Sequence, residues 1–143
     1  MQIQITTNDI ATINSLMDLN SKAMIGAYNG MVESANHVTS YIKAQLYSPI
    51  GKSGKPYYKK RTGVIHIPSK PGEYPAKLTG NLVGSIDSNV SLDEVEIGST
   101  LMEEYPSILE DYWDRSYLRR GIEENTSQIE DIIGNNIYQS LIG

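Results

Sequence analysis

Residues 7–49, TNDIATINSLMDLNSKAMIGAYNGMVESANHVTSYIKAQLYSP, decide the fold because they carry one long helical pattern. Apolar residues recur at steps of three, four or a sum of the two, as on one stripe of an amphipathic helix. The stripe comprises Ile10, Ile13, Met17, Met24, Ala27, Met31, Ala35, Val38, Ile42 and Leu46. The pattern predicts a helix over residues 8–47, ended by Ser48-Pro49 because a residue before proline is pushed out of the α region.

Two glycines lie inside this predicted helix. Gly26 and Gly30 each weaken a helix by about 1 kcal/mol relative to Ala, so we expect a kink or break near them. Unbroken, the helix would be about 60 Å long at about 1.5 Å per residue, longer than a small domain needs for its own core. Part of it is therefore expected to lie against something else.

After the first helix, apolar residues recur at every second position, as in a strand, and then return to the helical spacing. Residues 82–99 are predicted as a β-hairpin, because Leu82, Ile86 and Val90 alternate with polar residues and Val95 and Ile97 supply the partner strand. A second helical stripe then runs over residues 115–142. It comprises Leu118, Ile122, Ile129, Ile132 or Ile133, Ile137 and Leu141.

The predicted architecture is a single α+β domain over residues 1–143. A chain of this length is large enough to bury one core without disulfides. We expect the long N-terminal helix and the C-terminal helix to pack on one face of a small antiparallel sheet that carries a long basic loop. The order of segments is helix 8–47, basic loop 48–81, β-hairpin 82–99, acidic connector 100–114 and C-terminal helix 115–142.

Composition excludes several kinds of site. The chain has no cysteine, which removes disulfides, thiolate zinc sites and cysteine nucleophiles. No apolar run approaches the roughly 20 residues of a membrane span, and the first residues lack the pattern of a signal peptide. We expect synthesis in the cytoplasm and no membrane partner.

Charge is unevenly distributed along the chain. From Lys43 to Lys77 there are eight basic residues and one acidic residue, whereas from Asp87 to Asp131 there are thirteen acidic residues and three arginines. The basic part could meet DNA, or it could meet the acidic part of another copy of the chain. A third interpretation is two solvated faces that have no partner.

The basic part centres on residues 51–63, GKSGKPYYKKRTG. Neither register of this stretch satisfies the spacing of a phosphate-binding loop, which needs a glycine five residues before Gly-Lys-Ser/Thr. Tyrosines interleaved with cations are instead typical of contact with a nucleic-acid backbone. The predicted interface residues here are Lys52, Lys55, Tyr57, Tyr58, Lys59, Lys60 and Arg61, and their acidic counterparts are Glu94, Glu96, Glu103 and Glu104.

Catalytic, metal and cofactor sites are not predicted. His37 lies beside the apolar stripe, where a partly buried structural imidazole is expected, and His66 should face away from the core. Neither histidine lies within a short metal-ligand spacing of a carboxylate or of the other histidine. A small hydrolase that uses His66 and Glu73 is the weakest of the functions considered.

Four motifs in order resemble one protein family. They are His66-x-x-Ser69-x-Pro71-Gly72-Glu73-x-Pro75-Ala76-x-x-Thr79-Gly80-x-Leu82-x-x-Ser85-Ile86, Glu96-Ile97-Gly98-Ser99-Thr100, Tyr105-Pro106-x-x-Leu109-Glu110 and Arg115-Ser116-Tyr117-Leu118. Together they resemble the head-tail connector proteins of long-tailed double-stranded DNA phages, the neck or tail-completion family, over residues 51 to about 125. The chain departs from that pattern at residues 111–114, where the family has a Gly-Thr turn, and at Ser116, which replaces a proline.

The resemblance implies a structural virion protein in the phage neck, made in the bacterial host cytoplasm and without catalytic activity. It implies a ring of six or twelve copies that joins the portal side of the head to the tail and lets DNA pass. The implied partners are other copies, the neighbouring portal, adaptor or stopper and tail proteins, and transiently double-stranded DNA. The basic stretch would be a mobile arm that reaches a neighbouring subunit, an adjacent ring or the DNA.

Six of the matched residues are expected to shape the loop before the first strand. Pro71, Gly72 and Pro75 stiffen it, and Gly80 permits a backbone angle that other residues resist. Glu73, the one acidic residue among eight bases, is expected to pin the loop through an arginine or lysine of the same subunit. Thr79 completes the set.

A rival from another class is a dedicated, non-sequence-specific nucleic-acid-binding protein that uses the basic Tyr/Lys/Arg loop. It predicts salt-sensitive binding by the free monomer, whereas the connector hypothesis predicts assembly with little affinity for DNA at physiological salt.

Overall fold

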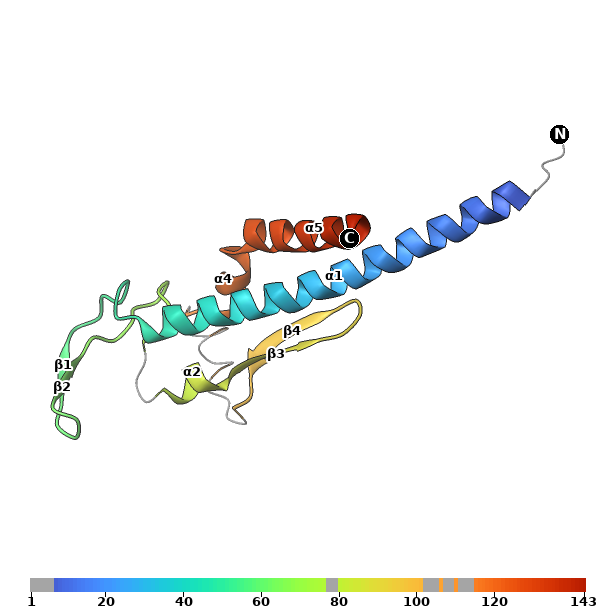
Figure 1. Ribbon diagram of the computed structural model, residues 1–143. Coiled ribbons are helices and arrows are strands. Elements are labelled where there is room, and N and C mark those ends of the chain that lie inside the picture. The colour runs from blue at the N-terminus through green and yellow to red at the C-terminus, as the bar shows by residue number, and fades with distance from the viewer. Residues whose placement is uncertain (1–6, 77–79, 102–105, 107–109, 111–114) are drawn as a thin grey trace.

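A computed structural model describes residues 7–76, 80–101, 106, 110 and 115–143, with side chains from Thr12 onward. Helix α1 spans Thr7–Tyr47, within one residue of the predicted start. Its two flanking layers are helix α5 (Thr126–Ile142) on one side and the hairpin of β3 (Ile86–Val90) and β4 (Val95–Ser99) on the other (Figure 1). The predicted α+β class is confirmed, but the expected packing of both long helices on one face of the sheet is wrong, because α5 packs on α1 and, of the two, only α1 packs on the hairpin (Figure 1).

The predicted break at the two glycines of α1 is wrong. The helix is continuous, and both glycines lie against α5. A Cβ atom on Gly26 would lie 2.7 Å from the backbone oxygen of Asn136, and one on Gly30 would lie 2.7 Å from the Cα of Ile133. The glycines therefore allow α5 to approach α1 closely, and the helix pair that results offsets their low helix propensity.

The β3–β4 hairpin begins at Ile86, four residues after the predicted start at residue 82. Residues Asn81–Ser85 form a short helix, α2, which follows Gly80 in the left-handed region at φ 89°. The prediction was wrong because Leu82 and Ile86 are four residues apart, a spacing that fits a helical turn as well as alternate positions of a strand. β3 then pairs antiparallel with β4, with Ser88 opposite Ile97.

The predicted basic loop contains a second hairpin. β1 (Tyr57–Lys59) pairs antiparallel with β2 (Val64–His66), with Tyr58 opposite Ile65. It stands away from the rest of the molecule, at the end of α1 opposite the N-terminus (Figure 1).

The predicted C-terminal helix is two helices, α4 (Leu118–Glu123) and α5. The break occurs at the buried Asn125, whose side-chain amide donates to the backbone oxygen of Gly121 at 2.7 Å. Its Oδ1 lies 2.9 Å from Nε2 of His37, so this histidine ties α1 to the corner although the residue is largely exposed. Most of the predicted acidic connector, residues 100–114, lies outside the described residues.

The core lies where α1 meets the β3–β4 hairpin and the start of α4. Its buried members are Val38, Ile42, Leu46, Tyr74, Ile86 and Tyr117. Tyr74 belongs to the loop that follows β2. One end of this loop therefore packs in the core, and its other end joins the projecting β1–β2 hairpin.

Candidate interaction surfaces

The arm, which we define as residues 55–67, is an antiparallel hairpin with a tight turn. The amides of Thr62 and Gly63 both donate to the backbone oxygen of Lys59, and Gly63 takes a positive φ of 69° that favours glycine. Val64 and Ile65 are 59% and 67% exposed. The arm thus carries apolar side chains that the described part of the chain leaves uncovered.

The arm also gathers most of the predicted cations and tyrosines. Lys55, Tyr57, Tyr58, Lys60 and Arg61 are exposed. Lys59 is half-buried. The ring of His66 packs edge to face against that of Tyr57, with 5.2 Å between the ring centroids. Burial, followed by the charge of Lys59, lowers the pKa of His66.

Lys52 does not belong to the arm surface. It is buried, its Nζ donates to the backbone oxygen of Gln45 at 2.7 Å, and it lies 5.9 Å from the centre of the Tyr74 ring. Burial lowers its pKa below the ordinary value for lysine, more than the nearby carboxylate of Glu73 raises it. The prediction of Lys52 as an interface cation is therefore wrong, because this side chain closes the last turn of α1.

Glu73 holds the loop, but by other donors than expected. Its carboxylate accepts from the amides of Ser53 at 2.9 Å and Lys70 at 2.8 Å, and from the hydroxyl of Ser53. These bonds, the hydroxyl first, lower the pKa of Glu73 to about 2. The side chain pins the loop as predicted, although hydrogen bonds from a serine and two amides replace the expected ion pair. A carboxylate of such low pKa is a poor general base near neutral pH.

Two arginines of the C-terminal part reach the same loop. Arg115 donates from Nε to the hydroxyl of Ser69 and from a terminal nitrogen to its backbone oxygen, both at 3.0 Å. Arg120 donates to the backbone oxygen of Gly72, a residue at φ 86°, and lies 5.0 Å from the centre of the Tyr74 ring.

Glu124 completes this contact between loop and helices. Its Oε2 accepts from the hydroxyls of Tyr41 at 2.5 Å and Tyr74 at 3.0 Å, and its Oε1 lies 3.9 Å from Nε of Arg120. Hydrogen bonding to Glu124 raises the pKa of Tyr41, and burial followed by the same carboxylate raises that of Tyr74. We call this set the anchor network. Its members are Tyr41, Lys52, Ser53, Ser69, Glu73, Tyr74, Arg115, Arg120 and Glu124.

Glu110 supports the start of α4, the helix that carries Arg120 of the network. Its carboxylate accepts from the amides of Tyr117 at 2.9 Å, Leu118 at 3.1 Å and Arg119 at 3.1 Å, and from the hydroxyl of Ser116 at 2.7 Å. Burial acts to raise the pKa of Glu110, but these hydrogen bonds outweigh it and lower the value. The side chain caps the first turn of α4, where the orphan amides of a helix need acceptors.

The outer face of the β3–β4 hairpin is acidic. Asp87, Glu94 and Glu96 are exposed, and Glu96 stands opposite Asn89 in the pairing of the two strands. Two of the predicted acidic residues, Glu94 and Glu96, therefore share a surface with Asp87, which was not predicted. The other two, Glu103 and Glu104, lie outside the described residues, as does Thr79.

Sequence reasoning missed the helix side of the anchor network. Tyr41 and Glu124 carry no signal, because each is one polar residue within a segment that the sequence predicts as an amphipathic helix. Arg115 and Ser69 were both part of the matched motifs, and a contact between them could have been inferred from that. Of the loop-shaping prolines, Pro75 is buried and Pro71 is exposed.

No protein-family model, curated protein or solved structure matches the chain. The resemblance to connector proteins therefore stays a prediction. None of the helices in the described ranges combines the length and the hydropathy that a membrane span requires. Within those ranges, no three His, Asp or Glu side chains come together as ligands for a metal ion.

Proposed function

We propose that this chain is a structural virion protein of a tailed phage, a subunit of a ring in the neck that joins the portal side of the head to the tail and lets DNA pass. The proposal places it in the virion, made in the host cytoplasm, with other copies and the flanking portal, adaptor or stopper and tail proteins as partners. It requires no catalytic residue.

One observation carries the proposal: a single copy presents two exposed surfaces of opposite charge on two different hairpins. The arm carries Lys55, Lys60 and Arg61, and the outer face of β3–β4 carries Glu94 and Glu96. The arm lies at the C-terminal end of α1, whereas the β3–β4 turn lies farther along α1 toward its N-terminus (Figure 1), so the two surfaces are apart within a copy.

Two different complementary surfaces favour a head-to-tail contact. Such a heterologous contact repeats from copy to copy and closes into a ring when the rotation allows. Opposite charges set the register and speed of such an encounter more than its final affinity. The anchor network supports this use of the arm, because it fixes the point from which the arm leaves the core.

The test is a charge swap read by light scattering at two salt concentrations. One variant reverses the arm (Lys59→Glu, Lys60→Glu, Arg61→Glu) and a second reverses the hairpin (Glu94→Lys, Glu96→Lys). Each variant alone is expected to assemble less than the parent chain, and the two reversals combined in one chain are expected to restore the ring mass. Restoration by the combination excludes a merely structural effect of either set.

The same measurements with double-stranded DNA separate the rival function. A connector subunit is expected to ignore DNA at about 150 mM salt. A monomer or dimer that binds DNA tightly at low salt, releases it steeply as salt rises and loses this binding on arm reversal would replace the connector proposal with a nucleic-acid-binding protein.

A further inference from the structure

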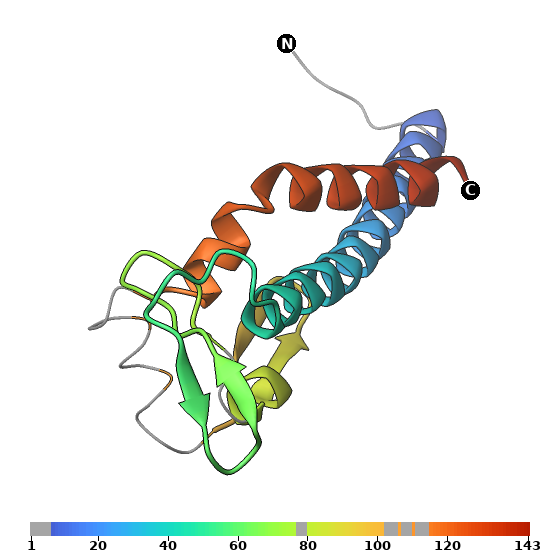
Figure 2. The same cartoon turned by 90° about the vertical axis from the view of Figure 1, so that its left-hand side faces the viewer.

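The N-terminal part of α1 extends beyond everything that packs on it. The hydroxyl of Ser140 in α5 donates to the backbone oxygen of Lys22 at 2.6 Å, and α1 continues past this point toward the N-terminus (Figures 1 and 2). Every side chain from Thr12 to Ser21 is exposed. We call residues 12–25, which include this last contact with α5 at Lys22, the extension.

The extension carries an apolar stripe that continues the buried one. Ile13, Met17, Met24 and Met31 follow one another at steps of four and seven residues, on the face of α1 that also bears the buried Ala35. Met17 and Met24 are 64% and 55% exposed. The face that packs on the β3–β4 hairpin in the second half of α1 is therefore uncovered in the first half.

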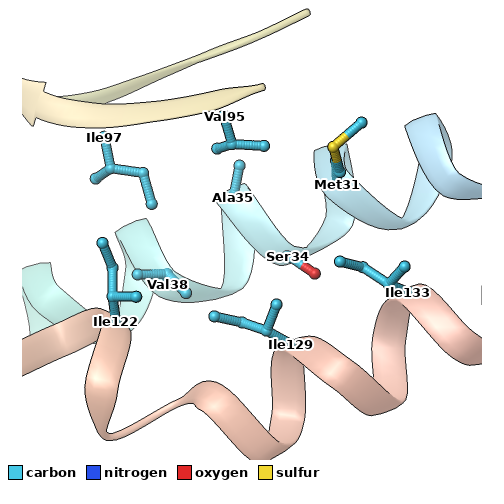
Figure 3. A pocket seen from close by; sticks show the side chains of 9 residues that line it. All are labelled: Met31, Ser34, Ala35, Val38, Val95, Ile97, Ile122, Ile129 and Ile133. Atoms are coloured by element: carbon cyan, nitrogen blue, oxygen red, sulfur yellow. The ribbon is translucent and has the colours of Figure 1, made fainter. Parts of the chain in front are cut away.

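An apolar slot lies between α1, β4 and the C-terminal helices (Figure 3). Its volume is about 150 Å³, and apolar side chains line it, among them Met31, Val95 and Ile133. A cavity of about this volume accommodates a benzene-sized group. One leucine or methionine side chain would fill it, and Ile122, which is 43% exposed, lies at its rim.

The slot contains one buried polar atom that needs a partner. Ser34 is 5% exposed, and its Oγ has no hydrogen-bond partner among the described residues. Figure 3 shows this hydroxyl among the side chains that line the slot. A buried hydroxyl without a hydrogen bond costs about 1–3 kcal/mol, so an occupant that supplies a polar group beside an apolar one is favoured.

We propose that the slot binds the extension of a second copy of the chain. The extension combines the two groups that the slot lacks: Met17 and Met24 are exposed apolar side chains, and Asn20 lies between them on the same face. Among the described residues, the Asn20 amide donates to the sulfur of Met24 at 3.8 Å, and thioether sulfur is a weak acceptor. In this register a methionine fills the slot and Asn20 donates to Ser34.

The contact is head-to-tail, because the extension and the slot are different surfaces. This inference rests on the proposed function only in taking the neighbour to be another copy. The extension and the slot are a second place where copies meet, besides the arm and the acidic hairpin.

Engineered cysteines test the contact cleanly, because the natural chain has none. Met17→Cys in one preparation is mixed with Val95→Cys in another and treated with a short bismaleimide, and products are sized under denaturing conditions. Ile122→Cys replaces Val95→Cys as a second slot position. The control partner is Ile50→Cys, a site that is 84% exposed and lies beyond the other end of α1.

The expected result is a linked two-chain product from the Met17 and slot cysteines at several times the yield of the Met17 and Ile50 mixture. Asn20→Leu in the Met17→Cys chain is expected to lower this yield. Equal yields with the slot and control cysteines would overturn the inference. So would a Met17→Cys chain that links to itself as readily as to the slot, because this would indicate two extensions packed together.

These outcomes are distinguishable from failure of the ring proposal. A ring of normal mass without the extension-to-slot product removes this contact and leaves the proposed function standing. The linked product from a protein that never exceeds a dimer keeps the contact and removes the ring.

Discussion

The arm is joined at both ends to residues of the anchor network, yet the arm and the network use their side chains in opposite ways. In the arm, Tyr58 and Ile65 face each other across two strands and both are exposed. In the anchor network, Tyr74 is buried with its hydroxyl bonded to Glu124. The difference shows that the chain stabilises the root of the arm with its own core and leaves the surface of the arm for another molecule.

The largest effect on the anchored region is expected from Gly121→Ala in α4. A Cβ atom there would overlap Cγ1 of the fully buried Ile42 and lie 2.6 Å from its Cδ1. Overpacking of this kind costs about 1–3 kcal/mol. The free energy of unfolding, measured by urea denaturation, should fall by that amount. Gly134→Ala in α5 is the matched control, since its Cβ atom would meet open space, and it should raise stability by about 0.5–1 kcal/mol.

Glu110→Gln is expected to come next, at about 1–2 kcal/mol. The substitution removes a charged acceptor that serves three amides and a hydroxyl at the start of α4. Urea denaturation measures the loss, and Glu130→Gln on the exposed face of α5 is the control. Equal stability of the two variants would contradict the assignment of Glu110 as the cap.

The pH dependence of folding should show the contribution of Glu73. Its pKa falls from the ordinary 4.5 to about 2 in the folded chain. The unfolded chain binds more protons in this window, so the stability that Glu73 contributes is present above pH 4.5 and is lost as the pH falls toward 2. In Glu73→Gln the decline of the urea midpoint between pH 4.5 and 2 should be shallower than in the parent chain. Parallel profiles would show that the carboxylate does not hold the loop.

The smallest effect on folding is expected from the arm itself. Lys55→Ala, Lys60→Ala and Arg61→Ala combined should change the free energy of unfolding by less than about 0.5 kcal/mol, because all three side chains are exposed. Thermal denaturation measures this. A loss of 2 kcal/mol or more would contradict the distinction between arm and anchor.

The long helices and the strand pairing of β3 with β4 were accessible from sequence, because apolar periodicity reports which face of an element is buried. The bounds of α2 were not, since Leu82 and Ile86 fit both periods. The break before α5 depends on a single buried amide, that of Asn125, whose contact with His37 joins residues 88 positions apart.

The candidate surfaces were partly predictable. Arm cations such as Lys60 and Arg61 were identified by their density in sequence. Lys52 was assigned to the same set because charge alone does not reveal that a lysine reaches the last carbonyls of a helix. The anchor network was missed because its members are scattered from Tyr41 to Glu124, and only folding brings them together.

The unbroken course of α1 has a further consequence. A helix of 41 residues is about 60 Å long, because its hydrogen bonds set a rise of about 1.5 Å per residue. The extension at one end of α1 and the root of the arm at the other are therefore held a fixed distance apart. A copy bound at both ends would set the spacing of its neighbours by the number of residues in this one element.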